Sequence, residues 1–462
     1  MAAVCILLTA SCGDDDDADS ATTEASEPAP EPTEAAPVET DATEATEPAP
    51  EATEAPAPTP TSAPEAEAEP LEPADLTLVA LSSYKPGLDP VIEAFEAENP
   101  GVTIEPSYYE AGDAYTTAVP TQFAGGNGSD IVFVLGGQAS PYSSTAFGRA
   151  GYLMDLSDEP WVETMYAPTR TLYEYEGALV ARDVGIAPLS IISYNKDYFA
   201  ENSLTEPTTF AELLTLCETV AGLGIVPIAW GGANPAVNSN NVATLAGNTV
   251  QSEDGEWLAK RIAGETTFAE TPGWRRALEQ LVEMNEGGCF SPGASGAPLA
   301  DMVSMFASGQ SAMMFTSGIL LGQVLAQTPD LNPGMFPAPG DTADSTRVTA
   351  QASGGLGIWT GTDHEEAAKR FLEYVSRSDV IAGLAGGNSI ISSSDATEGN
   401  LPGVYGDLVD YFSDDKVVTD FTARWPNTSM NMLTGQSIQG IFTGQKSVDD
   451  VLNDMDTYFE QT

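Results

Sequence analysis

The sequence is poor in positive charge. Its 462 residues include 16 Lys and Arg against 69 Asp and Glu, which gives a formal net charge of −53 at pH 7. Such acidity argues against nucleic acid or an anionic membrane surface as a partner, because both are themselves negatively charged. The chain also lacks any uninterrupted apolar run of about 18 residues, so we expect no transmembrane helix.

Residues that commonly carry catalysis or bind metals are scarce as well. The single histidine, His364, lies beside Asp363, the expected cap of a surface helix, so we expect it to be solvated. The chain has no Cys/His cluster with metal-site spacing, no Walker A loop and no Gly-x-Ser-x-Gly nucleophile motif. The sequence therefore predicts no enzyme, no metal and no cofactor. Carboxylate pairs are common in so acidic a chain, so a secreted glycoside hydrolase stays open as an alternative.

The first twelve residues resemble the signal of a bacterial lipoprotein. A short apolar run, residues 2–8, leads through small residues to Cys12. In such signals the residues before the cysteine are removed and its thiol receives a lipid. We therefore expect Cys12 to anchor the chain to the extracellular face of the cell membrane. No basic residue precedes Lys85, so we expect the reading frame to begin upstream. The alternative to a lipoprotein signal is an unstructured N-terminus with two incidental cysteines, Cys5 and Cys12.

Residues 13–75 consist almost entirely of Asp, Glu, Ala, Thr, Ser and Pro, with twenty acids and no base. A segment without a periodic apolar face cannot bury enough surface to offset its ordering entropy. Charge repulsion and proline favour extended chain. We therefore expect a disordered spacer between the lipid and the folded part.

The folded part, about 387 residues, is long enough for two domains. It keeps two cysteines, Cys217 and Cys289. In an exported protein we expect these two to form a disulfide; the alternative is a pair of buried thiols.

Strand and helix patterns alternate along this part, which indicates an α/β fold with mostly parallel sheets. The expected strands are residues 75–81, 102–104, 130–135 and 226–230. A first helix contains Val91 and Phe95 and stops at 99–101, and amphipathic helices cover 274–284 and 365–375. Thr209 and Glu212 form the pattern of a capping box before a further helix.

Six short motifs occur along the chain in the order in which one known family has them. They are Gly-Gly-Asn-Gly-Ser-Asp-Ile at 125–131, Gly-Tyr-Leu-Met-Asp-Leu at 151–156, Tyr-Asn-Lys-Asp-Tyr-Phe at 194–199, Glu-Pro-Thr-Thr-Phe-Ala-Glu at 206–212, Phe-Ala-Ser-Gly-Gln-Ser-Ala-Met at 306–313 and Glu-Ala-Ala-Lys-Arg-Phe-Leu at 366–372. On these motifs, residues 76–462 resemble the extracellular solute-binding proteins of ABC importers, in the sugar-binding group that includes maltose-binding protein.

The resemblance implies a two-lobed, type II periplasmic-binding-protein-like fold with a ligand cleft between the lobes. It implies that lobe 1 comprises residues 76–188 and 353–395, and lobe 2 residues 189–352 and 396–462. The lobes are then expected to close around the ligand by a hinge motion.

The resemblance also places candidate ligand-binding residues in loops at the cleft. They are Ser82, Ser83, Tyr84, Gly136, Gly137, Gln138, Trp230, Gly231, Asn234, Ser317, Gly318, Gly354, Gly355, Trp425 and Asn427. Hydroxyl and amide groups would bond sugar hydroxyls, and an indole would stack on a pyranose ring. Several have a plainer alternative: capping for Ser82 and Ser83, a simple turn for 136–138, and packing for Trp230 and Trp425. Ile319 stands where many sugar binders have an aromatic residue.

The expected function is that of an ABC transporter's substrate-binding component. It would capture a mono- or oligosaccharide outside the cell and deliver it to permease subunits, as a lipid-anchored monomer that binds no nucleic acid. A surface lipoprotein that captures glycans without transport is a further alternative.

Overall fold

The computed structural model describes residues 71–110, 113–316, 318–387, 390–427 and 429–461. The expected lipoprotein signal, Cys12 and most of the expected spacer lie outside these residues. The description below concerns the compact unit that spans residues 68–462.

A five-stranded sheet with the order β2-β1-β3-β13-β6 forms the centre of what we call lobe 1. Its strands are β1 (Ala74–Leu81), β2 (Val102–Tyr109), β3 (Ile131–Val134), β13 (Gly355–Ile358) and β6 (Arg182–Asp183). The first three are parallel, with Ala74 opposite Val102, whereas β13 runs antiparallel to both β3 and β6. Three of the strands expected from the sequence are thus confirmed.

A four-stranded sheet with the order β11-β8-β10-β9 forms the centre of lobe 2. Its strands are β8 (Ile191–Asn195), β9 (Val226–Ala229), β10 (Ser311–Thr316) and β11 (Pro333–Pro337). Only the β9–β10 pair is parallel; β8 runs antiparallel to both of its neighbours. The expectation of mostly parallel sheets is therefore wrong for this lobe, because β8 enters it directly from the other lobe rather than through a crossover helix.

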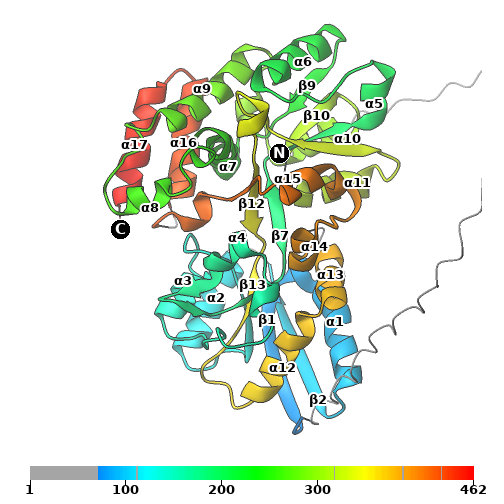
Figure 1. Ribbon diagram of the computed structural model, residues 1–462, viewed down its shortest axis with the longest axis vertical. Coiled ribbons are helices and arrows are strands. Elements are labelled where there is room, and N and C mark those ends of the chain that lie inside the picture. The colour runs from blue at the N-terminus through cyan, green and yellow to red at the C-terminus, as the bar shows by residue number, and fades with distance from the viewer. Residues whose placement is uncertain (1–70, 111–112, 317, 388–389, 428, 462) are drawn as a thin grey trace, which may run out of the picture. The chain divides into compact units, whose positions relative to one another are not determined.

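Two strands, β7 (Ile186–Leu189) and β12 (Val348–Ala352), run side by side between the lobes (Figure 1). With β14 (Val417–Thr419) they form a separate three-stranded sheet. A third connection passes beside them, where Ile391 pairs with Ile186 and the hydroxyl of Ser393 donates to Asp183. The chain therefore passes between the lobes three times, and the three crossing segments lie next to one another.

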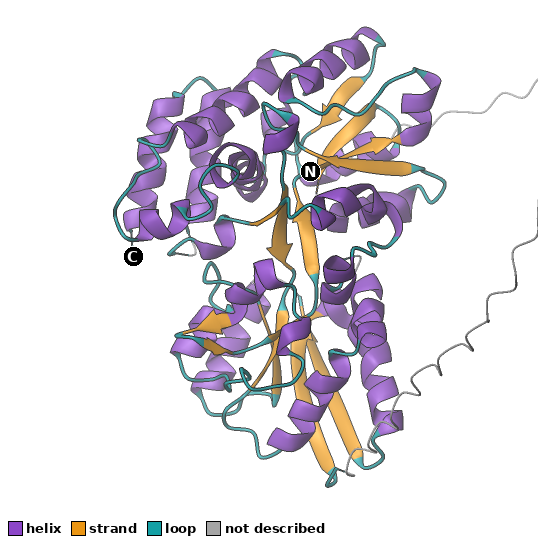
Figure 2. Ribbon diagram, in the orientation of Figure 1, coloured by secondary structure: helices purple, strands orange, loops and turns teal. Residues whose placement is uncertain are grey.

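Helices cover the sheets of both lobes (Figure 2). Those of lobe 1 are α1 (Lys85–Glu98), α2 (Asp113–Ala124), α3 (Ser144–Arg149), α4 (Ala167–Arg170), α12 (Glu365–Val375) and α13 (Ser378–Gly387). Those that follow in lobe 2 are α5 (Lys196–Glu201), α6 (Phe210–Gly222), α7 (Pro235–Ala246), α8 (Trp257–Ile262), α9 (Pro272–Glu286), α10 (Leu299–Ala307), α11 (Gly318–Gln327), α15 (Val409–Ser413), α16 (Met430–Phe442) and α17 (Val448–Glu460). The short helix α14 (Ser393–Glu398) belongs to the third crossing.

Each central sheet lies in its own hydrophobic core. Leu78, Phe95 and Phe371 are buried in the core of lobe 1, and Phe210, Trp274 and Leu452 in that of lobe 2. Among the described residues, no helix is long and apolar enough to cross a membrane.

Local sequence signals account for several helix ends. Thr209 and Glu212 make the expected capping box at the start of α6, so this prediction is confirmed. Helix α12 also covers its expected range, but its N-cap is His364 and not Asp363. The hydroxyl of Thr362 accepts a hydrogen bond from the His364 amide, which moves the start of the helix one residue on.

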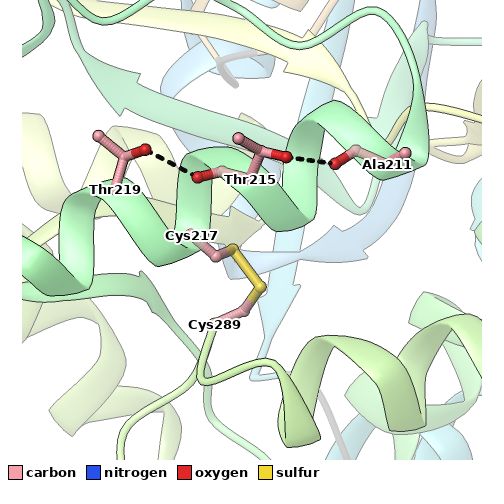
Figure 3. Close-up of a disulfide and its surroundings, with 5 residues drawn as sticks. All are labelled: Ala211, Thr215, Cys217, Thr219 and Cys289. Carbon is pink, nitrogen blue, oxygen red and sulfur yellow. Dashed lines mark hydrogen bonds between the residues drawn. A yellow bond between two sulfur atoms is a disulfide. The ribbon is translucent and has the colours of Figure 1, made fainter.

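The expected disulfide between Cys217 and Cys289 is present, with the two Cα atoms 4.9 Å apart (Figure 3). Both cysteines are buried in the core of lobe 2. The bond connects α6 to the turn after α9 and encloses a loop with a sequence separation of 72 residues, which contains β9 and α7 to α9.

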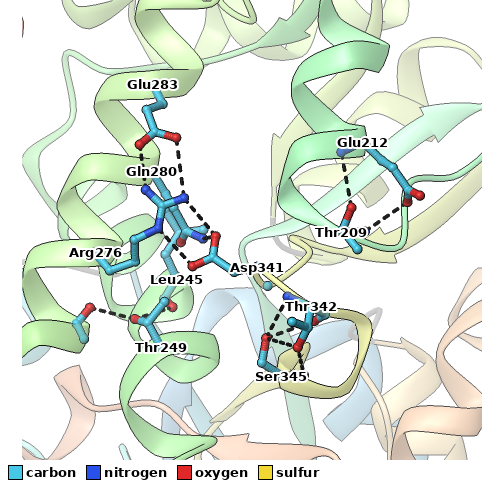
Figure 4. A network of polar contacts seen from close by, with 12 residues as sticks. Thr209, Glu212, Leu245, Thr249, Arg276, Gln280, Glu283, Asp341, Thr342 and Ser345 are labelled. Atoms are coloured by element: carbon cyan, nitrogen blue, oxygen red, sulfur yellow. Dashed lines mark hydrogen bonds and ion pairs between the residues drawn. The ribbon is translucent and has the colours of Figure 1, made fainter.

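A polar network on lobe 2 ties α9 to the loop after β11 (Figure 4). The Arg276 guanidinium donates two parallel hydrogen bonds to Asp341, at 2.9 and 2.8 Å, and another to Glu283 at 2.6 Å. These charge-assisted bonds hold the pKa of Asp341 below its usual value.

Candidate ligand-binding site

The two lobes touch directly at a contact that we call the interlobe clasp, formed by Gly137, Gln138 and Thr171 of lobe 1 and by Ala423 and Arg424 of lobe 2. Gln138 donates from its backbone amide to the Ala423 carbonyl at 2.9 Å and from its side chain to the Arg424 carbonyl at 2.8 Å. The Arg424 guanidinium donates to the Thr171 hydroxyl at 2.6 Å. The lobes are linked covalently by the three crossing segments alone. These hydrogen bonds therefore help to determine the orientation of one lobe against the other.

Glycine is required at position 137 for this contact. The residue has a φ of +85°, and a Cβ atom there would lie 2.1 Å from the Ala423 carbonyl oxygen. A larger residue would therefore both strain the backbone and push the lobes apart.

Asp420 shapes the lobe 2 side of the clasp. It is fully buried and accepts hydrogen bonds from the amide of Thr422, at 3.0 Å, and from the Thr422 hydroxyl. Burial raises the pKa of Asp420, and these hydrogen bonds oppose the rise only in part. The carboxyl group holds the turn at Thr422–Arg424 in the form that presents its carbonyl groups to lobe 1.

Two hollows, each of about 210 Å³, adjoin the clasp and are lined by residues of both lobes. The β12 hollow is lined by Leu135, Gly136, Ala139, Ser140, Gln351, Ala352, Thr422, Ala423, Asn431 and Met432. The Arg424 hollow is lined by Gly137, Gln138, Thr145, Thr171, Leu172, Ile262 and Arg424.

The described residues that line the β12 hollow are all neutral. Ser140, Gln351, Thr422 and Asn431 supply hydroxyl and amide groups, and Met432 adds an exposed apolar side chain. The Oδ1 atom of Asn431 is buried and has no hydrogen-bond partner among the described residues. Such a wall suits an uncharged solute that both donates and accepts hydrogen bonds.

The residues predicted after β1 lie at the lobe 1 end of the crossings. Ser82 is half-buried and donates to Glu110 at 2.9 Å, and Ser83 is exposed. Tyr84 is buried, with its ring centroid 4.5 Å from that of Phe133 and its hydroxyl donating to a carbonyl of the second crossing. Burial raises its pKa, so it stays a neutral donor. Tyr84 therefore braces the crossing, whereas the two serines are accessible.

The loop after β3 supplies residues to both hollows. Gly136 lines the β12 hollow, and Gly137 and Gln138 line the Arg424 hollow. The side-chain amide of Gln138 is already bonded to lobe 2, so its binding role and its role in the clasp compete.

Trp230 lies in the core of lobe 2, where only 2% of its surface is exposed. Its ring packs against Phe290 and Phe442, with centroids 4.7 and 4.9 Å away. Asn234 caps α7, and Gly231 is packed against the start of α10. This placement favours the packing alternative for Trp230.

The next four candidates are Ser317, Gly318, Gly354 and Gly355. Ser317 lies outside the described residues, and Gly318 begins α11. Gly354 and Gly355 are buried against the aromatic rings of Phe133 and Tyr173.

Trp425 is buried in the core of lobe 2, with 1% of its surface exposed. Asn427 accepts hydrogen bonds from the first amides of α16, and its side chain donates to the carbonyl groups of Tyr458 and Gln461. Neither residue is among those that line the two described hollows.

The structure therefore brings Gly136, Gly137 and Gln138 to a space between the lobes. It adds residues that the sequence did not indicate, namely Ser140, Gln351, Thr422, Arg424, Asn431 and Met432. None of these residues belongs to a recognisable motif. The one feature of the sequence that could have indicated Asn431 is its position directly after the buried Met430, at the start of α16.

The described residues contain no group of three or more His, Cys, Asp or Glu side chains that could hold a metal ion. Two α/β lobes, three crossings and hollows between the lobes are the features of a hinged solute-binding protein.

A protein-family model described as bacterial extracellular solute-binding protein matches residues 81–381, well over half of the chain. The chain belongs to this family. It is thus an extracellular solute-binding protein of the ABC transporter type and not an enzyme, so the glycoside hydrolase alternative is wrong.

Individual relatives agree with this assignment. A binding protein of Brucella abortus is 23% identical over 396 residues, which cover 80% of this chain and 88% of the relative. A multiple sugar-binding protein of Streptococcus mutans is 21% identical over 63% of this chain and 67% of its own length.

Solved structures share the fold. A family 1 extracellular solute-binding protein from Bifidobacterium longum subsp. infantis superimposes with a TM-score of 0.70, at 19% identity, over 85% of this chain and all of its own. RafE determined in complex with raffinose gives a TM-score of 0.67, at 18% identity, over 83% of this chain and 98% of its own.

Proposed function

We propose that the solute is a carbohydrate, a mono- or oligosaccharide, which the protein captures outside the cell and delivers to the permease subunits of an ABC importer. The observation that carries this proposal is the β12 hollow, a neutral space between the lobes lined by hydroxyl and amide groups. Sugar hydroxyls donate and accept hydrogen bonds at once and therefore match such a lining. The multiple sugar-binding protein and the RafE complex with raffinose described above support the same class of ligand.

We propose that ligand contacts come from both lobes. Ser82, Ser83, Gly136 and Gln138 stay as candidates on lobe 1, with Ser140 added. Lobe 2 would contribute Thr422, Asn431 and Met432, and Gln351 would contribute from β12. The unpartnered Oδ1 atom of Asn431 would accept a hydrogen bond from a ligand hydroxyl.

Ligand binding would close the lobes about the crossings, at lobe boundaries near residues 188/189, 352/353 and 395/396. A micromolar dissociation constant corresponds to about −8 kcal/mol, enough to shift an open–closed equilibrium of a few kcal/mol. Small-angle scattering should therefore show a smaller radius of gyration with saturating ligand. An unchanged radius would contradict hinge closure.

We also propose that the protein acts as a monomer held at the membrane by a lipid on Cys12, with residues 13–75 as the spacer. A Cys12→Ala form should leave the membrane fraction without any loss of ligand affinity. Retention of this variant in the membrane fraction would contradict the lipid anchor.

Calorimetry or thermal shift against a panel of sugars, polyols, amino acids and peptides tests the ligand class. Stabilisation by sugars is the expected result, and stabilisation by amino acids or peptides alone would exclude the carbohydrate proposal. Glycan capture without transport predicts binding without delivery, so uptake of the bound sugar by cells, lost on deletion of the gene, separates the two functions.

A further inference from the structure

Arg424 is unusual among the basic residues of this chain. Twelve of the sixteen Lys and Arg residues form an ion pair with a carboxylate. Arg424 is one of the four that form no ion pair with a described carboxylate, although carboxylates outnumber bases several-fold. In so acidic a protein, a guanidinium left without a carboxylate within 4 Å among the described residues needs a reason.

The surroundings of Arg424 leave most of its donors unused. A guanidinium carries five N–H donors, and within the described part of the chain this side chain donates only to the Thr171 hydroxyl, at 2.6 Å. Burial lowers the pKa of Arg424, and the charges of Glu174 and Glu256, both exposed, oppose this from beyond ion-pair distance. The side chain is thus partly desolvated and positively charged, with free donors.

The Arg424 hollow provides the rest of a binding site. Thr145 and Thr171 add hydroxyl groups, and Leu172 and Ile262 form an apolar wall. Ile262 is 61% exposed, the most of any large hydrophobic residue in the described part of the chain. The guanidinium group, the hydroxyl groups and the apolar surface together match a sugar ring that carries a carboxylate.

We propose that the Arg424 hollow binds the carboxylate of an acidic sugar, so that the solute includes a uronate residue. The planar guanidinium would accept the carboxylate through two parallel hydrogen bonds, which a lysine could not reproduce. Thr145 would bond a ring hydroxyl, and Ile262 would cover the apolar face of the ring. The inference rests on the carbohydrate function proposed above: the acidic residue of the sugar would occupy the Arg424 hollow, and a neutral residue the β12 hollow.

The test compares matched neutral and acidic ligands by calorimetry: galactose with galacturonate, glucose with glucuronate, and oligomers of each. The acidic member should bind at least tenfold more tightly, a difference of about 1.4 kcal/mol. Arg424→Gln should abolish this preference, because the acidic member should lose at least tenfold more affinity than the neutral member. Arg424→Lys should restore it only in part.

Arg347→Gln is the matched control, because it removes the same charge from another arginine without an ion pair. The Arg347 guanidinium donates to the backbone carbonyls of Asp344 and Thr346, and it lines neither hollow. This variant should keep the full preference for the acidic sugar. A similar loss in both variants would show that only net charge matters and would overturn the site.

The other outcomes separate the two proposals. Tight binding of neutral sugars with no preference for uronates overturns the Arg424 site and leaves the carbohydrate function standing. Equal weakening of neutral and acidic ligands by Arg424→Gln also overturns it, because Arg424 would then serve only the clasp. Binding of non-sugar carboxylates alone, with loss in Arg424→Gln, would refute the carbohydrate function but retain the anion site. Absence of binding by every carboxylate in the panel refutes the inference.

Discussion

Replacing Trp230 by alanine distinguishes a packing role from a stacking role for its indole. The ring is 2% exposed and lies against Phe290 and Phe442, so its removal would leave a cavity in the core of lobe 2. Such truncations of buried aromatic residues cost about 3–5 kcal/mol. We therefore expect a large loss of stability and a change in ligand affinity of less than twofold.

The expected shift in melting temperature follows from the size of the folded part. An unfolding entropy of about 2.1 cal/mol/K per residue gives about 0.8 kcal/mol/K for about 390 residues that unfold together. The Trp230→Ala variant should then melt about 4–6 °C lower in differential scanning calorimetry. Trp274→Ala is the matched control, since that indole is also fully buried among lobe 2 rings. A tenfold loss of sugar affinity in Trp230→Ala alone, with an unchanged melting temperature, would refute the packing role.

Three further changes test the disulfide, the clasp and the polar network of lobe 2. Replacing Cys217 and Cys289 by serine should cost about 4 kcal/mol in urea unfolding, given the 72-residue separation, whereas equal stability of oxidised and reduced protein would contradict this. Gly137→Ala should weaken ligand binding and enlarge the ligand-bound radius of gyration in scattering, because its Cβ would meet a lobe 2 carbonyl at 2.1 Å; wild-type closure would show that the clasp tolerates it. The Asp341 carboxylate, with its pKa lowered by Arg276, stabilises the fold above its unfolded pKa near 3.8, and this contribution is lost as the pH falls through the folded value. Arg276→Gln should therefore cost more stability at pH 7 than at pH 3 in urea unfolding, and an equal cost at both would refute the coupling.

Signals confined to a few neighbouring residues were predictable from the sequence. The capping box at Thr209, the amphipathic helix α12 and the apolar strand β3 each depend on side chains within one element, and all three are found where expected. The order of motifs likewise sufficed to identify the family, because it samples both lobes.

The candidate site was less predictable, because it depends on which distant segments meet. The sequence could not show that Trp230 and Trp425 point into the core of lobe 2, since an aromatic residue after a strand fits a pocket or a core equally well. It also could not indicate Arg424 or Asn431. Their positions between the lobes follow from the burial of Phe421 and Trp425 on either side of the clasp turn and from the packing of α16 against α7.

The route of the chain through the three crossings determines how the protein can be divided. Strand β13, beyond residue 354, completes the lobe 1 sheet that begins at Ala74, so neither lobe is a continuous stretch of sequence. A gene truncated between the lobes would encode a lobe 1 that lacks β13, one of the five strands of its sheet, so β3 would become an open edge and β6 would lose its partner. A protease cut in any single crossing would leave the halves joined by the other two. Such a nicked protein should still run as one particle under native conditions and separate into fragments only when denatured.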